Sequence, residues 1–253
     1  MYSKQWTRII LITSPFAIAL SLLLSILYGA KHLSTDIVFT SLIHFDPGNT
    51  DHQIIWHSRI PRAAGALLIG AALAVSGALM QGITRNYLAS PSIMGVSDGS
   101  AFIITLCMVL LPQSSSIEMM IYSFIGSALG AVLVFGLAAM MPNGFTPVQL
   151  AIIGTVTSML LSSLSAAMSI YFQISQDLSF WYSARLHQMS PDFLKLAAPF
   201  FLIGIIMAIS LSKKVTAVSL GDDISKSLGQ KKKTIKIMAM LSVIILTGSA
   251  VAL

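Results

Sequence analysis

Between Arg62 and Arg85 the sequence reads AAGALLIGAALAVSGALMQGIT, which is 22 residues without a charged side chain. A charged side chain at the centre of a bilayer costs about 2.5–3.5 kcal/mol even on the lenient insertion scale. An α-helix needs about 20 predominantly apolar residues to cross the hydrocarbon core. This segment therefore predicts a membrane-spanning helix, and charge-free gaps become the criterion for finding others.

Similar gaps recur along the chain. Between Glu118 and Asp177 lie 58 residues without Asp, Glu, Lys or Arg, too many for one helix, and the helix-breaking cluster from Pro142 to Pro147 divides them in two. The gaps predict an all-α integral membrane protein, a polytopic helical bundle forming a single domain over residues 1–253. The seven predicted spans cover residues 9–30, 61–83, 92–112, 118–141, 147–171, 193–212 and 236–253.

The composition excludes other classes of protein. Of 253 residues, 55% are hydrophobic and 9% are charged, whereas a soluble globular chain has about 25% charged residues. A soluble enzyme and a disordered protein are both excluded. The sequence also lacks a P-loop, a G-x-S-x-G and an H-E-x-x-H motif, so we expect no catalytic residues and no cofactor.

Basic residues orient the predicted helices. With the N-terminus in the cytoplasm, the inner segments contain ten Lys and Arg residues and the outer segments five, as the positive-inside rule requires. Seven of the fifteen Lys and Arg residues lie between Ser212 and Ile237. The net charge of +6 therefore indicates contact with membrane lipids and not with nucleic acid.

Histidines gather in one predicted outer loop. Four of the five lie between Lys31 and Ser58, near Asp46 and Asp51, which is compatible with a metal site or with a solvated loop. No pair of these residues has helical or zinc-type spacing. We therefore expect no metal site.

Three short motifs accompany the second predicted span. They are Arg59-Ile60-Pro61-Arg62, then Arg85-Asn86-Tyr87-Leu88-Ala89-Ser90-Pro91, then Gly95-Val96-Ser97-Asp98-Gly99. Close helix packing and a turn between two helices could explain them. As a string, however, they resemble the signature of the FecCD family, the membrane subunits of ABC importers for iron-siderophores, haem and vitamin B12. Tyr87 stands where that family usually has proline.

This resemblance implies a function and a set of partners. It implies a multi-pass permease of the bacterial inner membrane that passes an iron(III)-siderophore from an extracytoplasmic binding (lipo)protein into the cytoplasm. A second permease subunit and cytoplasmic ATP-binding subunits would complete the complex, and ATP hydrolysis would reside in those partners, so the chain is not itself an enzyme. The segment Trp181 to Arg185 is more similar to ferric-hydroxamate permeases than to vitamin B12 permeases.

Two further expectations follow. The family fold has ten helices, so a chain with seven is expected to be C-terminally truncated. The alternative is a self-contained ion-coupled secondary transporter or channel. Such carriers usually contain buried carboxylates, histidines or lysines, and the predicted spans have none near their centres, so energy is expected to come from a partner.

Hydroxyl groups and arginines supply the candidate transport residues. Thr155, Ser158, Ser162, Ser165 and Ser169 recur at intervals of three and four, which places them on one helical face. They could pack against another helix or line the translocation path, as the equivalent helix does in the family. The resemblance further implies a cytoplasmic gate at Asn143 and Thr146, and docking of the binding protein by Arg59, Arg62 and Arg185. Interfacial anchoring is the alternative for Arg59 and Arg62.

The predicted cytoplasmic loop over residues 213–235 contains a short helix. Acidic residues begin it, Gly229 follows as its cap, and three apolar residues lie on one face. In the family a similar element is the coupling helix that contacts the ATPase. The residues to which this role is carried over are Leu220, Gly221, Asp222, Asp223, Ile224, Leu228 and Gly229. The alternative is a polybasic loop that binds anionic lipid.

Overall fold

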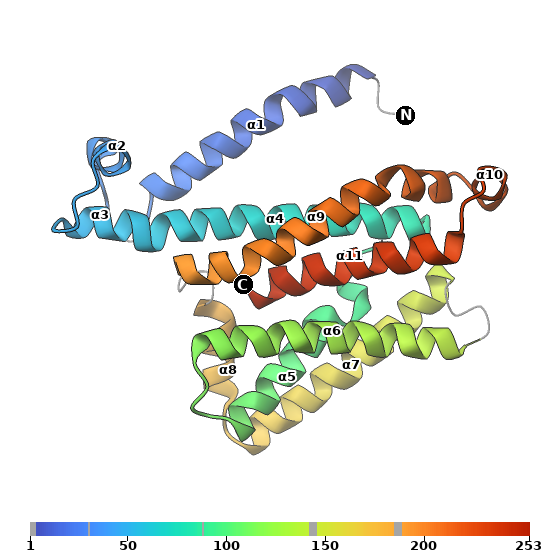
Figure 1. Ribbon diagram of the computed structural model, residues 1–253. Coiled ribbons are helices and arrows are strands. Elements are labelled where there is room, and N and C mark those ends of the chain that lie inside the picture. Colours follow the sequence, from blue (N-terminus) through green and yellow to red (C-terminus); the bar gives the residue numbers. More distant parts are fainter. Residues whose placement is uncertain (1–3, 30, 88, 142–145, 185–188) are drawn as a thin grey trace. The chain divides into compact units, whose positions relative to one another are not determined.

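The computed structural model describes residues 4–29, 31–87, 89–141, 146–184 and 189–253, and these residues form helices and connecting segments with no β-strand (Figure 1). The prediction of an all-helical chain is confirmed. In chain order the helices are α1 (Lys4–Leu27), α2 (Thr35–Ile43), α3 (Thr50–Ile54), η1 (Ile55–Arg59), α4 (Ile60–Thr84), η2 (Pro91–Met94), α5 (Val96–Leu110), α6 (Ser116–Met140), α7 (Pro147–Tyr171), α8 (Ser175–Ala184), α9 (Pro191–Ser219), α10 (Asp222–Ser227) and α11 (Lys232–Ala252).

Six helical stretches within the described residues are long and apolar enough to cross a membrane. They are Gln5–Leu27, Thr50–Thr84, Ser116–Met140, Val148–Tyr171, Pro191–Ser219 and Lys233–Ala252. These stretches support a multi-pass membrane protein.

The expected span over residues 92–112 is built differently. A 3₁₀ turn, η2, ends at Gly95, whose φ of +68° lies in the left-handed region that favours glycine. The α-helix that follows, α5, has 15 residues. At 1.5 Å per residue its length is about 22 Å, which is less than the roughly 30 Å hydrocarbon core. The count of seven spans is therefore not confirmed.

Two helices extend beyond the expected spans. The helical stretch that includes α4 begins at Thr50, and α9 continues past residue 212 to Ser219. The first seven residues of the expected loop 213–235 are consequently helical. Lys213 and Lys214 remain exposed on this extension.

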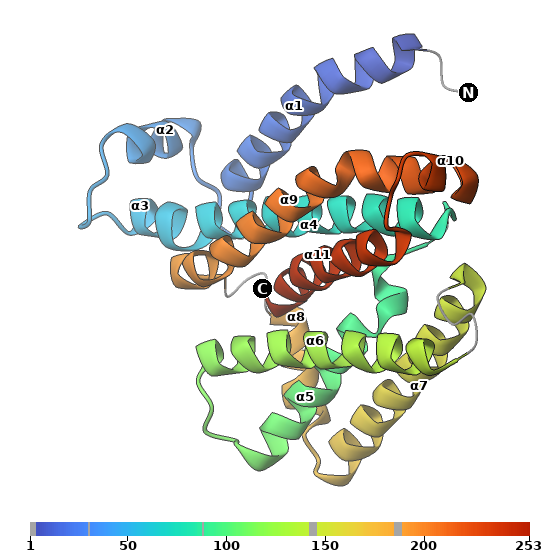
Figure 2. The ribbon, with the colours of Figure 1, turned by 45° about the vertical axis from the view of Figure 1, so that its right-hand side comes forward.

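The chain divides into two compact units. The first comprises residues 1–67 and 186–194, and it has a small apolar core at Leu33, Val38 and Ile55. The second comprises residues 68–185 and 195–253, and its core draws residues from α4, α5, α6, α7, α9 and α11. Figure 2 shows α5, α6 and α7 side by side within this second unit.

The backbones of α5 and α6 approach each other closely because glycines face one another. A Cβ added at Gly126 would lie 2.6 Å from the carbonyl oxygen of Gly99, and one added at Gly130 would overlap the carbonyl oxygen of Gly95. Small residues allow this approach where helices pack in lipid. The same interface contains a buried hydrogen bond of 2.7 Å between the hydroxyls of Ser100 and Ser123.

We predict that Gly130→Ala destabilises the second unit. The added methyl group must displace the backbone of α5, and overpacking of this kind costs about 1–3 kcal/mol. Gly136→Ala on the same helix is the matched control, because a Cβ there meets no atom within 4 Å. Thermal unfolding in detergent should show a lower midpoint for Gly130→Ala alone, and equal midpoints would contradict the glycine contact.

Candidate functional site

An open cavity of about 430 Å³ lies in the second unit, where α7 passes the N-terminal end of α5. The described residues that line it are Ser92, Asp98, Thr155, Ser158, Met159, Ser162 and Ser163. Five of them carry hydroxyls and one carries a carboxylate. The arrangement can therefore offer many weak hydrogen bonds to a polar solute.

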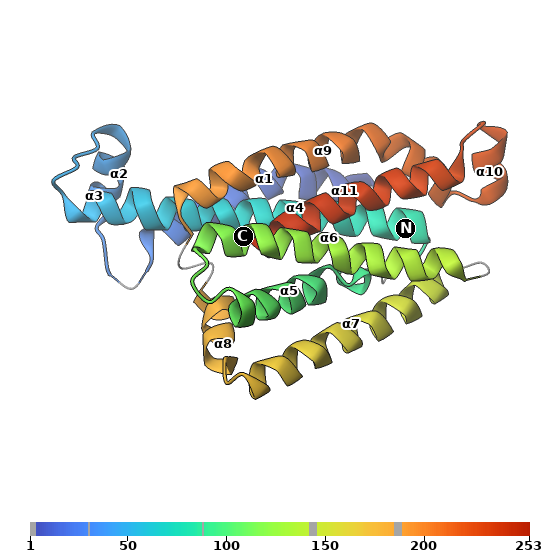
Figure 3. The ribbon, with the colours of Figure 1, turned by 60° about the horizontal axis from the view of Figure 1, so that its bottom comes forward.

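Helix α7 supplies most of this wall. Its first turn is capped by Thr146, whose hydroxyl oxygen accepts the backbone N–H of Gln149 at 3.4 Å. Farther along, Thr155, Ser158 and Ser162 share one face of the helix and all three line the cavity. Figure 3 shows α7 lying beside α5. The structure thus brings together three of the five hydroxyls expected from the sequence.

The remaining two hydroxyls of that face are not among the described lining residues. The buried Ser165 hydroxyl donates to the carbonyl of Leu161 at 3.0 Å, and the buried Ser169 hydroxyl donates to that of Ala166 at 2.9 Å. Serine side chains often bond to the preceding turn of their own helix in this way. A path lined by all five hydroxyls stays a prediction, and the cavity itself is lined by three of them.

Other lining residues were missed or interpreted differently from the sequence. Asp98 is the third residue of α5 and lines the cavity, although it was not among the expected path residues. Ser163 falls outside the spacing of three and four that identified the other hydroxyls, so periodicity gave no signal for it. The hydroxyl oxygen of Ser158 is buried and has no hydrogen-bond partner among the described residues.

Two arginines in the first unit cap the C-terminal end of α1. Arg59 is 4% exposed, and its Nη1 donates to the carbonyls of Ile26 at 2.6 Å and Leu27 at 2.8 Å. Arg62 donates through Nη2 to the carbonyl of Ser25 at 3.1 Å. The last carbonyls of a helix lack partners within the helix, so these arginines satisfy groups that would otherwise be unpaired.

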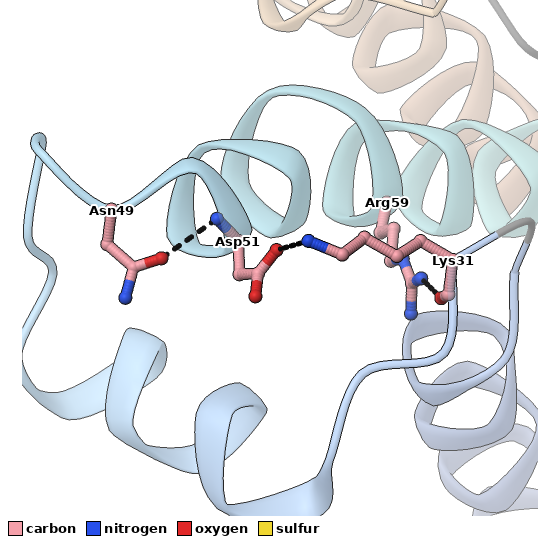
Figure 4. A network of polar contacts seen from close by, with 4 residues as sticks. All are labelled: Lys31, Asn49, Asp51 and Arg59. Carbon is pink, nitrogen blue, oxygen red and sulfur yellow. Dashed lines mark hydrogen bonds and ion pairs between the residues drawn. The ribbon is translucent and has the colours of Figure 1, made fainter.

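Polar contacts continue from Arg59 into the segment between α1 and α3 (Figure 4). The Nη2 of Arg59 donates to the carbonyl of Lys31, and the Lys31 side chain forms an ion pair with Asp51. The side chain of Asn49 accepts the N–H of Asp51 at 2.9 Å and caps α3. The network links the end of α1 to the start of the α3 helix.

The histidine-rich loop has structural hydrogen bonds of its own. His52 is buried, and its Nδ1 accepts the backbone N–H of Asp46 at 3.1 Å. In the part of the chain that the structure describes, no group of three or more His, Cys, Asp or Glu side chains could hold a metal ion.

The expected coupling element contains the six-residue helix α10. The N–H of Gln230 donates to the carbonyl of Ser225 at 3.0 Å, and Gly229 adopts a φ of +66°, which together form a Schellman-type cap. Three apolar side chains are exposed around α10, namely Leu220, Ile224 and Leu228. Arg85 donates through Nε to the carbonyl of Val218 at 2.8 Å, so the segment before α10 is tied to the end of α4.

Not every expected site residue can be placed. Asn143 and Arg185 lie outside the described residues. Asp222 and Asp223 form the start of α10, and Gly221 precedes them with a φ of +137°.

Comparison with known proteins identifies the family. Residues 17–253 match the FecCD transport family. The chain belongs to the FecCD transport family. It is 41% identical over 255 residues to the iron(3+)-hydroxamate import system permease protein FhuB of Bacillus subtilis strain 168, an alignment that covers 98% of this chain and 66% of FhuB.

The names of other relatives state different substrates. The chain is 36% identical to the Fe(3+)-citrate import system permease protein YfmD of the same organism, over 94% of this chain and 69% of YfmD. It is 31% identical to the ferric enterobactin transport system permease protein FepD of Escherichia coli strain K12, over 91% of this chain and 69% of FepD. The chain thus spans about two thirds of the length of these FecCD relatives.

A solved structure shares the fold. It is described as an inward-facing conformation of a metal-chelate type ABC transporter, and it superposes with a TM-score of 0.77 at 28% sequence identity. The match covers 96% of this chain and 73% of that chain. The resemblance to FecCD permeases seen in the motifs is confirmed.

We predict that Arg59→Ala destabilises the first unit more than Arg62→Ala does. Arg59 donates to three carbonyls and is buried, whereas Arg62 is half-buried and donates to one of the α1 carbonyls. Leaving buried acceptors unsatisfied costs about 1–3 kcal/mol each. Limited proteolysis of membranes should cleave the segment after α1 faster in Arg59→Ala, and identical cleavage rates in both variants would contradict the capping role.

Proposed function

We propose that this FecCD chain is the transmembrane permease subunit of an ABC importer that passes an iron(III)-siderophore of the hydroxamate type into the cytoplasm. The proposal rests on the hydroxyl-lined cavity beside α7 in a chain of this family. The hydroxamate class is supported by the 41% identity to FhuB, an iron(3+)-hydroxamate permease by name. The proposed location is the bacterial inner membrane, with the N-terminus in the cytoplasm.

A wall of hydroxyls suits a conduit. Each hydroxyl can donate or accept a hydrogen bond, and a neutral hydrogen bond contributes only about 1 kcal/mol net. Thr155, Ser158 and Ser162 can therefore replace part of the hydration of a polar chelate without binding it tightly. The cargo can leave as readily as it enters, which a transport path requires.

We further propose that the energy and the cargo come from partner proteins. The exposed apolar group of Leu220, Ile224 and Leu228 supports docking of α10 in a groove of an ATP-binding subunit. The open side of the α7 cavity supports a second permease subunit, identical or homologous, that completes the path.

Docking of an extracytoplasmic binding protein is assigned to Arg62 and Arg185. Arg59 was expected to share this role, but its burial against α1 favours the capping role. Arg62 is only half-buried and can still meet an acidic partner. Asn143 and Thr146 remain the proposed gate residues, with Thr146 exposed at the start of α7.

ATP-dependent uptake tests the proposed function. Membrane vesicles that contain the complete complex, the binding protein and an iron(III) hydroxamate chelate should accumulate iron only with ATP inside. Replacing the Walker lysine of the ATP-binding subunit with alanine should abolish uptake. Uptake that survives this replacement, or that follows an ion gradient, would favour the self-contained carrier instead.

The coupling role of α10 is tested separately. The double variant Ile224→Asp, Leu228→Asp places two charges in the proposed apolar contact, so co-purification of the ATP-binding subunit should fall by roughly tenfold or more. Ser227→Asp is the control, because Ser227 is an exposed polar residue on the same helix. Undiminished co-purification in the double variant would remove the coupling assignment.

A further inference from the structure

We propose that Asp98 makes the cavity beside α7 discriminate by charge, so that this permease favours neutral or cationic chelates over anionic ones. The inference rests on the proposed function, because it assumes that the cavity is part of the cargo path. It adds a specificity-determining residue and a substrate charge class.

Asp98 is the only ionisable side chain among the described residues that line the cavity. Its carboxylate forms no hydrogen bond and no ion pair with another described residue. The negative charge is therefore not neutralised within the described part of the chain. A single charge on the wall of this open cavity acts on a charged solute that comes within several ångströms of it.

The fold fixes the position of this carboxylate. Asp98 directly precedes Gly99, whose backbone packs against Gly126 and Gly130 of α6. Because those contacts leave α5 little freedom to move, Asp98 stays beside α7 and shares the cavity with Ser158 and Ser162. The carboxylate of Asp98 therefore lies on a helix that is packed tightly against its neighbour, and not on a loop.

The chemistry of the lining separates chelate classes. An iron(III) tris-hydroxamate core is neutral, and its amide or ammonium groups can donate hydrogen bonds to Asp98 while its oxygens accept them from the hydroxyls. Chelates built on catecholate or citrate carry net negative charge, and no basic residue among the described lining residues compensates it. Asp98 would repel them.

A charge series on one scaffold tests this selection. Ferrioxamine B carries a single positive charge, its N-acetyl derivative is neutral, and its N-succinyl derivative carries a single negative charge, while the iron core is the same in all three. Uptake of each is measured in vesicles that contain the complete complex and binding protein. The preference of the binding protein is common to all permease variants, so it cancels when ratios of uptake are compared between them.

Asp98→Asn should lower the ratio of cationic to anionic uptake by about tenfold, with the neutral chelate changing least. Asp98→Glu keeps the charge and should retain the wild-type ratio, which separates charge from a role in starting α5. Asp177→Asn is the matched control, because Asp177 is exposed on α8 and does not line the cavity.

The outcomes distinguish this inference from the proposed function. If the unmodified complex shows ATP-dependent uptake but Asp98→Asn leaves the ratio unchanged, charge selection by Asp98 is overturned and the permease assignment stands. Equal loss of all three chelates in Asp98→Asn would also overturn it, because the carboxylate would then serve folding or gating. Absence of ATP-dependent uptake in the unmodified complex would instead overturn the proposed function.

Discussion

The close approach of α5 and α6 at their glycines is the contact on which the candidate site depends. Helix α5 is too short to reach across a bilayer as a regular span, and its N-terminal end is fixed by Gly95 and Gly99 against Gly130 of α6. That position places Ser92 and Asp98 opposite the hydroxyl face of α7. A side chain larger than hydrogen at these glycines would move one wall of the cavity relative to the other.

The last carbonyls of a helix have no partner within that helix and must be satisfied in lipid. Arginines at the two ends of α4 donate hydrogen bonds to such carbonyls. In the first unit Arg59 donates to the last carbonyls of α1, and in the second unit Arg85 donates to Val218 near the end of α9. Motif arginines that resemble docking residues in sequence can therefore serve structure. In this chain Arg59 is buried and caps α1, whereas Arg62 is partly exposed, which leaves docking open to it.

Charge-free gaps located the long helices because the penalty for a charge in lipid acts on each helix independently of its neighbours. The gaps could not show that Gly95 interrupts the third predicted span, because that break depends on a backbone conformation and not on polarity. Helical periodicity identified Thr155, Ser158 and Ser162, but it could not show that Ser165 and Ser169 bond to their own helix. Asp98 was visible in the motif, yet its place in the cavity depends on how α5 packs against α6 and α7, which one sequence does not reveal.

The central claim is that the hydroxyl face of α7 lines an aqueous path. Single cysteines introduced into a Cys107→Ser background at positions 158 and 162, and at positions 156 and 160 on the opposite face, test it most directly. In membranes that contain the complete complex, a water-soluble methanethiosulfonate reagent should modify the cysteines at 158 and 162 much faster than those at 156 and 160. Equal rates on both faces, or faster modification at 156 and 160, would contradict the account.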